Sequence, residues 1–163
     1  MKAILKFIKK YSRVIFIVYI LVLLLVLVLK FPQMNMFHSI VDGWKTGNKS
    51  RFVTESQYIP FKTIIEYVRH VHSFDDWFFK NLACNLLMFM PFGFLAPLFM
   101  KRNKIWQILI YGIIASFLIE VLQVLLAVGT GDIDDIILNA FGTLIGFGIY
   151  KLIFSVALKN SLD

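Results

Sequence analysis

The chain has 163 residues, of which 59 % are hydrophobic, and its mean hydropathy is +0.76, which exceeds what a soluble domain of this size needs to fill one core. Its formal net charge of +7 comes from Lys and Arg residues at the ends of apolar runs, so the charge indicates membrane topology and excludes a nucleic-acid interface. The single cysteine, Cys84, lies inside an apolar run, which excludes an internal disulfide and a thiolate metal site. The composition predicts an all-α integral membrane protein.

The first apolar run, residues 14–29, reads VIFIVYILVLLLVLVL and carries no charge. With its flanking residues it approaches the roughly 20 residues that a transmembrane helix needs. Only Lys30 follows it closely, whereas five basic residues precede it: Lys2, Lys6, Lys9, Lys10 and Arg13. This asymmetry predicts a cytoplasmic N-terminus, with residues 1–30 forming a basic segment and the first span. A signal peptide is disfavoured, because no small-x-small cleavage site follows the run.

Three further apolar runs predict a core of three transmembrane helices over residues 81–159. The expected spans are residues 81–100, 105–128 and 136–158. Basic residues follow the second span at Lys101 to Lys104 and lie at the far end of the fourth at Lys151 and Lys159. The sequence therefore predicts four transmembrane helices with both termini in the cytoplasm.

The loop of residues 31–80 is expected to be extracytoplasmic and to contain an interfacial amphipathic helix that lies on the outer leaflet. Apolar residues recur there at spacings of three and four, with charged residues between them: Phe61, Ile64, Ile65, Val68 and Val71 alternate with Lys62, Glu66 and Arg69. Pro60 is expected at the first helical position. Trp77, Phe78 and Phe79 are expected to anchor the loop at the membrane surface.

Polar residues inside the three core spans share one face of each predicted helix. On the third span Gly112, Ser116, Glu120 and Gln123 follow spacings of four, four and three. The fourth span has Asp135, Asn139, Gly142, Gly146 and Tyr150 in line, and the second has Asn81 and Asn85. The stripes are expected to converge in the outer half of the membrane.

Glu120 is the strongest indication of a site. A carboxylate within a membrane costs at least about 2.5 kcal/mol, so such residues usually face a bundle interior or a cavity and mark a functional position. The structural alternative is that Glu120 and Gln123 only hold the helices together by hydrogen bonds to Asn85 and Asn139.

The stretch GTGDIDD before the fourth span contains more acid than a helix cap needs. Asp132 is expected to cap the fourth helix and Asp135 to lie at its third position, where the helix dipole favours a carboxylate. Because capping uses one or two acids, the surplus favours a polar pocket over capping alone.

The second and fourth spans carry residues that shape helix packing. Pro91 and Pro97 predict a kink or a break in the second span. Gly142 and Gly146 are expected to let another helix pack closely against the fourth.

The order of five short motifs resembles the VanZ-like family. The motifs are I-P-F-K-T-I at residues 59–64, N-L-L-x-F-x-P-F-G at 85–93, E-x-x-Q at Glu120 and Gln123, D-x-x-D-x-x-x-N at Asp132, Asp135 and Asn139, and G-x-x-x-G at Gly142 and Gly146. The resemblance covers about residues 57–150. It implies a bacterial plasma-membrane protein that contributes to glycopeptide resistance, against teicoplanin more than vancomycin. This chain has GTG where many members have Arg, which weakens a bidentate clamp for phosphate or carboxylate.

Three functions remain open. In the first, a binding module holds a membrane lipid, a lipoglycopeptide or a cell-wall precursor in an outer-leaflet pocket lined by Asn81, Asn85, Glu120, Gln123, Asp132, Asp135 and Asn139. In the second, Glu120, Asp132 and Asp135 hold Mg²⁺ or Ca²⁺ in an intramembrane enzyme that acts on a lipid-linked substrate. The third is a structural or transporter-like role, which four spans without an inverted repeat disfavour.

The residues favour binding over catalysis. The spans contain no evident nucleophile and base pair and no histidine, and His70 and His72 of the outer loop point to different faces of a helix. The sequence identifies no cofactor, and it assigns no metal ligand to the pocket in the first hypothesis.

Overall fold

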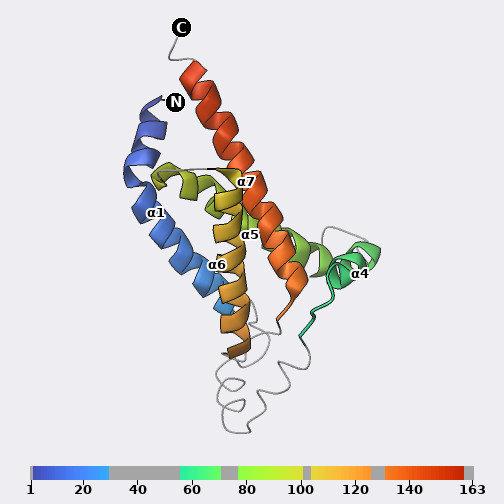
Figure 1. Ribbon diagram of the computed structural model, residues 1–163. Coiled ribbons are helices and arrows are strands. Elements are labelled where there is room, and N and C mark those ends of the chain that lie inside the picture. The colour runs from blue at the N-terminus through green and yellow to red at the C-terminus, as the bar shows by residue number, and fades with distance from the viewer. Residues whose placement is uncertain (1, 30–55, 71–76, 101–103, 126–130, 160–163) are drawn as a thin grey trace.

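The computed structural model describes residues 2–29, 56–70, 77–100, 104–125 and 131–159. These residues form the helices α1 (Lys2–Leu29), α4 (Lys62–His70), α5 (Trp77–Phe99), α6 (Ile105–Leu125) and α7 (Ile133–Lys159) (Figure 1). Within these ranges, extended backbone pairs only in one parallel bridge, between Gln57 and Asp132. The all-α prediction is confirmed.

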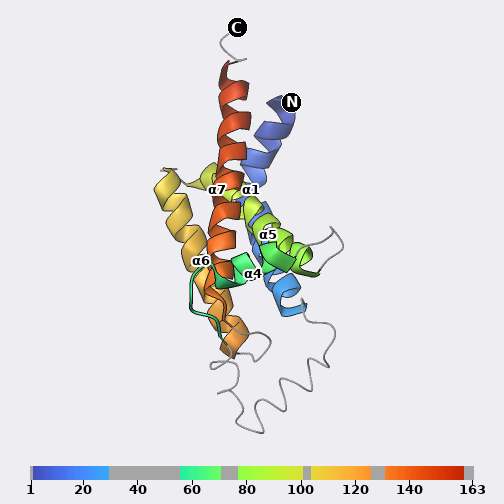
Figure 2. The ribbon, with the colours of Figure 1, turned by 90° about the vertical axis from the view of Figure 1, so that its right-hand side faces the viewer.

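Three helices are long and apolar enough to cross a membrane, over Leu82–Phe99, Ile105–Leu125 and Ile133–Phe154. They correspond to the three spans of the predicted core. α1 forms as one continuous helix but is not among these three, so the fourth span stays a prediction. The start of α1 and the end of α7 lie at the same end of the molecule (Figures 1 and 2); the side of the membrane that they face also stays a prediction.

Two helices begin before the spans that were expected in them. α7 begins at Ile133, three residues before the expected span and directly after its predicted cap, Asp132. α5 begins at Trp77, so Trp77, Phe78 and Phe79 form its first turn, whereas its candidate span, Leu82–Phe99, agrees with the expected residues 81–100. Val71 and His72 lie outside the described residues.

α5 and α7 pack with their backbones in close contact. A Cβ built on Gly142 would collide with the carbonyl oxygen of Leu86, and one on Gly146 with that of Met90. On α5, a Cβ on Gly93 would collide with the carbonyl oxygen of Thr143. The prediction that these α7 glycines serve helix packing is confirmed, since only a missing side chain permits this approach.

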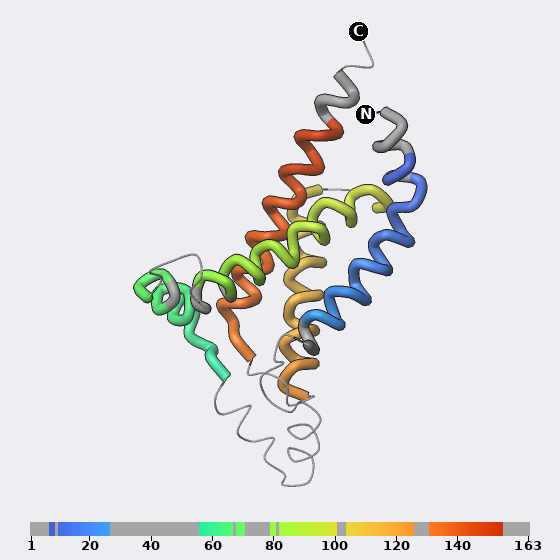
Figure 3. The backbone as a smooth tube through the Cα atoms, turned by 180° about the vertical axis from the view of Figure 1, so that it is seen from behind, coloured from blue at the N-terminus to red at the C-terminus, as the bar shows by residue number. Residues whose placement is uncertain are grey.

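Of the predicted kink or break, α5 shows no break, since it remains helical through Pro91 and Pro97. Its path bends toward its C-terminal end, as Figure 3 shows. α1 packs against this bent helix: the Tyr19 hydroxyl donates to the Met88 carbonyl oxygen over 2.6 Å, and the Phe16 ring lies 5.4 Å from that of Phe92. The tyrosine satisfies its polar atom on the α5 backbone while its ring stays in apolar contact.

Candidate functional site

At the end of the bundle where α7 begins, a short segment, residues 56–59, is hydrogen-bonded to the start of that helix. The Gln57 N–H donates to the Gly131 carbonyl oxygen over 2.8 Å, and the Ile133 N–H donates to the Gln57 carbonyl oxygen over 3.0 Å. The Gly131 N–H donates to the Ser56 hydroxyl over 3.0 Å. This segment runs beside the start of α7 (Figure 3). The part of the chain before α4 is therefore fixed to the turn before α7.

Asp132 caps α7, as the sequence predicts. Its Oδ1 accepts the N–H of Asp134, the second residue of the helix, over 2.8 Å. The backbone N–H of Asp132 donates to Glu120 Oε2 of α6 over 3.1 Å. Burial raises the pKa of the Asp132 carboxyl, against opposing hydrogen bonds from the Asp134 N–H and the Thr63 side chain. One residue thus joins the start of α7 to the buried acid of α6.

Asp134 is the acid to which the sequence assigned no task, and it is fully buried. Its carboxylate accepts the N–H of Phe61 over 2.5 Å and the N–H of Ile64 over 3.0 Å. These donors are among the N–H groups that a helix start leaves without intrahelical partners, so Asp134 caps α4 from another helix. The surplus acid that favoured a pocket therefore has a structural task.

The sequence contains part of the signal for this contact, but not the pairing itself. α4 begins at Lys62, two residues after Pro60, so the expected helical position of Pro60 is wrong. Phe61, which precedes the helix, has no side-chain oxygen to cap it. Its φ is 65°, in the left-handed region that non-glycine residues rarely adopt. A helix start without a capping side chain indicates unmet backbone donors, and the surplus aspartate indicates a spare acceptor, but neither indicates that the two pair.

Asp135 faces α5. The Asn85 Nδ2 donates to the Asp135 Oδ1, and Asn85 is buried. The three aspartates of the DIDD stretch therefore contact three partners: Asp132 caps its own helix, Asp134 caps α4 and Asp135 binds α5.

One helical turn after Asp135, the Asn139 side chain of α7 faces α6. Its side-chain Nδ2 donates to the Ser116 Oγ over 2.8 Å. Its backbone carbonyl oxygen accepts a hydrogen bond from the Thr143 hydroxyl over 2.9 Å. Ser116 and Thr143 are fully buried, and Asn139 is 5 % exposed. The Asn139 Oδ1 is buried and has no hydrogen-bond partner. An unsatisfied side-chain oxygen at such a position carries a free-energy cost unless another group donates to it.

The candidate residues gather at this end of the three-helix core. Buried among them are Asn85, Glu120, Gln123 and Asn139, while Asp132 and Asp135 are half-buried. Asn81 lies on α5 one turn from Asn85, and its side chain lies outside the described residues. The structure brings the polar stripes of α5, α6 and α7 together; that they bind a ligand stays a prediction. We call Asn85, Glu120, Gln123, Asp135 and Asn139 the polar cluster.

The described residues include no group of three His, Cys, Asp or Glu placed to hold a metal ion. The ligand set of Glu120, Asp132 and Asp135, which the enzyme hypothesis requires, is therefore not assembled there.

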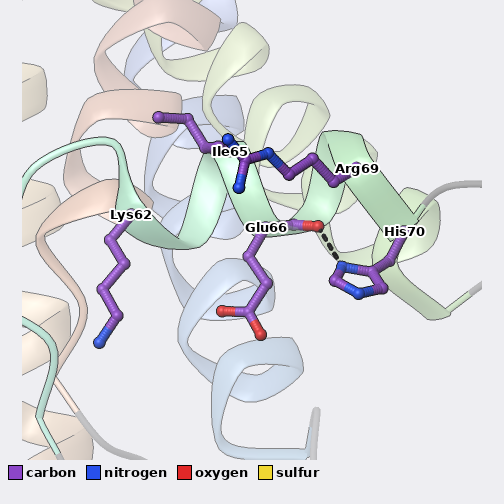
Figure 4. A pocket seen from close by; sticks show the side chains of 5 residues that line it. All are labelled: Lys62, Ile65, Glu66, Arg69 and His70. Atoms are coloured by element: carbon purple, nitrogen blue, oxygen red, sulfur yellow. Dashed lines mark hydrogen bonds between the residues drawn. The ribbon is translucent and has the colours of Figure 1, made fainter.

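A hollow of about 480 Å³ lies outside the polar cluster, on the exposed face of α4. It is lined by Lys62, Ile65, Glu66, Arg69 and His70 (Figure 4). The His70 Nδ1 lies 2.7 Å from the Glu66 carbonyl oxygen and donates to it.

Comparison with known proteins places the chain in a family. It is 30 % identical over 74 residues to "Protein VanZ" of Enterococcus faecium, across 45 % of this chain and 46 % of that protein. The chain thus matches about half the length of this curated relative. No solved structure matches the chain. The model of the VanZ/LLP1 family matches residues 16–154, which include α4, α5, α6 and most of α7, and the chain belongs to that family.

Proposed function

We propose that the protein lies in the bacterial plasma membrane and contributes to teicoplanin resistance or envelope homeostasis. In this proposal the polar cluster binds the polar part of an amphiphile: a lipid, a lipoglycopeptide or a cell-wall precursor. The observation that supports it most is the buried Asn139 Oδ1, which has no partner.

The free energy of burial argues against helix packing as the sole task of the cluster. Leaving a buried acceptor unpaired costs roughly 1–3 kcal/mol, and a carboxylate within a span adds to that cost. Glu120 is 7 % exposed and lies between Ser116 and Gln123, both also buried. Polar residues kept at such a cost are expected to meet a ligand that donates hydrogen bonds.

The position of the cluster favours an amphiphile. Asn85 and Asp135 lie near the starts of the candidate spans of α5 and α7, and Glu120 lies near the end of α6. A headgroup at that depth has its acyl chains beside the apolar faces of the spans. Teicoplanin carries an acyl chain and vancomycin does not, so a protein that acts there is expected to distinguish the two.

The test is the teicoplanin and vancomycin susceptibility of a host with and without the protein. The variants are Glu120→Gln, Asp135→Asn and Asn139→Leu, expressed at membrane levels matched by immunoblot. Gly148→Ala is the matched control, because a Cβ there meets open space on α7.

The proposal expects the wild type and the control to raise the teicoplanin inhibitory concentration at least four-fold more than that of vancomycin, and the cluster variants to lose this effect. Variants that protect as well as the wild type would show that the polar cluster serves only helix packing. A wild type that protects against neither drug would remove the resistance function.

A further inference from the structure

α4 has an apolar side that the described residues leave largely exposed. Phe61, Ile65 and Val68 are 52 %, 47 % and 62 % exposed, whereas Ile64 is half-buried. In the preceding segment Tyr58 and Ile59 are 65 % and 62 % exposed. Five large apolar residues within eleven positions form a contiguous surface of the kind that contacts a membrane or a partner.

This surface lies at the end of the bundle where α7 begins. The Asp134 carboxylate holds the first turn of α4, and the bridge between Gln57 and Asp132 holds the segment before it. The candidate span of α7 starts at Ile133, one residue from both anchors. α4 is therefore attached at the level where an apolar span meets the membrane surface.

Two basic residues border the apolar surface. Lys62 and Arg69 both line the hollow together with Ile65. In Figure 4 Lys62 and Glu66 extend to one side of α4, and Arg69 extends toward Ile65 on the other. The three charges leave one net positive charge beside an exposed apolar surface, the pattern of a helix that lies in the headgroup region of an anionic membrane.

We propose that α4 docks onto anionic phospholipid in the leaflet at this end of the bundle. Phe61, Ile65 and Val68 would contact the acyl boundary, and Lys62 and Arg69 would contact headgroup phosphates. This lipid contact is separate from the polar cluster and does not depend on the resistance function. Each basic residue near an anionic surface strengthens binding about five-fold, so loss of either is expected to weaken the docking by about that factor.

The test is amide hydrogen exchange of residues 61–70 in the full-length protein, reconstituted at one copy per nanodisc. One set of nanodiscs contains phosphatidylcholine alone, and the other contains phosphatidylcholine with about a third phosphatidylglycerol. Lys62→Gln and Arg69→Gln remove the charges without touching the Asp134 bonds, which use backbone donors. Lys151→Gln is the control, because it removes an exposed charge near the other end of α7.

The proposal expects α4 exchange to be about five-fold slower in the anionic nanodiscs, with most of the difference lost in either α4 variant and retained in the control. Equal exchange in both lipids would overturn it. So would an unchanged lipid difference in both α4 variants. Slower exchange that requires two copies in one nanodisc would assign the surface to a second copy of the chain instead. Because resistance is measured separately, either proposal can fail while the other stands.

Discussion

Replacement of Asp134 by Asn tests whether α4 is held by a cap from α7. The Asp134 carboxylate accepts two backbone N–H groups, from Phe61 and Ile64. An Asn of the same shape keeps one acceptor oxygen and turns its NH₂ group toward the second donor. Hydrogen bonds to a charged acceptor contribute about 1.5–3 kcal/mol each and neutral ones about 0.5–1.5 kcal/mol. Since both bonds are part-buried, we take the low end of each range, so each bond weakens by about 1 kcal/mol. The α4 cap is then expected to lose about 2 kcal/mol of stabilisation.

That loss corresponds to α4 opening about thirty-fold more often. The assay is amide hydrogen exchange of residues 61–70 in detergent micelles, with peptides of α6 as an internal reference that should not change. The matched control is Gly148→Ala, also on α7, because a Cβ there meets open space. If α4 exchanges at the same rate in Asp134→Asn and in Gly148→Ala, the reasoning that assigns the cap of α4 to the buried carboxylate is refuted.

Three further predictions use thermal unfolding in detergent. Gly146→Ala should lower the free energy of unfolding by about 1–3 kcal/mol because its Cβ meets the α5 backbone, whereas Gly148→Ala, which meets open space, should be neutral or slightly stabilising; equal effects would contradict the packing. Because burial raises the pKa of Asp132, its contribution to stability should decline as pH rises from about 4 through the folded pKa. The stability of the wild type relative to Asp132→Asn should fall over that range, and a constant difference would contradict the shift. A double-mutant cycle of Asn139→Leu and Ser116→Ala should give a coupling of about 0.6 kcal/mol, and additivity would contradict the hydrogen bond between them.

The helices of the core could be predicted because their signals are local. Apolar runs of sufficient length locate α5, α6 and α7, and the face shared by Ser116, Glu120 and Gln123 follows from helical spacing alone. All three side chains are buried. The cap by Asp132 is equally local, since donor and acceptor are two residues apart.

The role of Asp134 could not be assigned from its neighbours in sequence. Its partners are backbone N–H groups 73 and 70 positions away, and backbone donors carry no residue type that a sequence pattern can detect. The same holds for the Gln57 bridge. α7 begins at Ile133, three residues before the expected span, because Asp132 caps the start of the helix.

The long sequence separation between α4 and its cap sets an order of assembly. A chain made from its N-terminus presents residues 61–64 well before Asp134 exists, and domains and their parts form as the chain emerges. The first turn of α4 can acquire its carboxylate cap only after the first residues of α7 have been synthesised. The cap of α4 is thus a contact that the chain can complete only late in its synthesis.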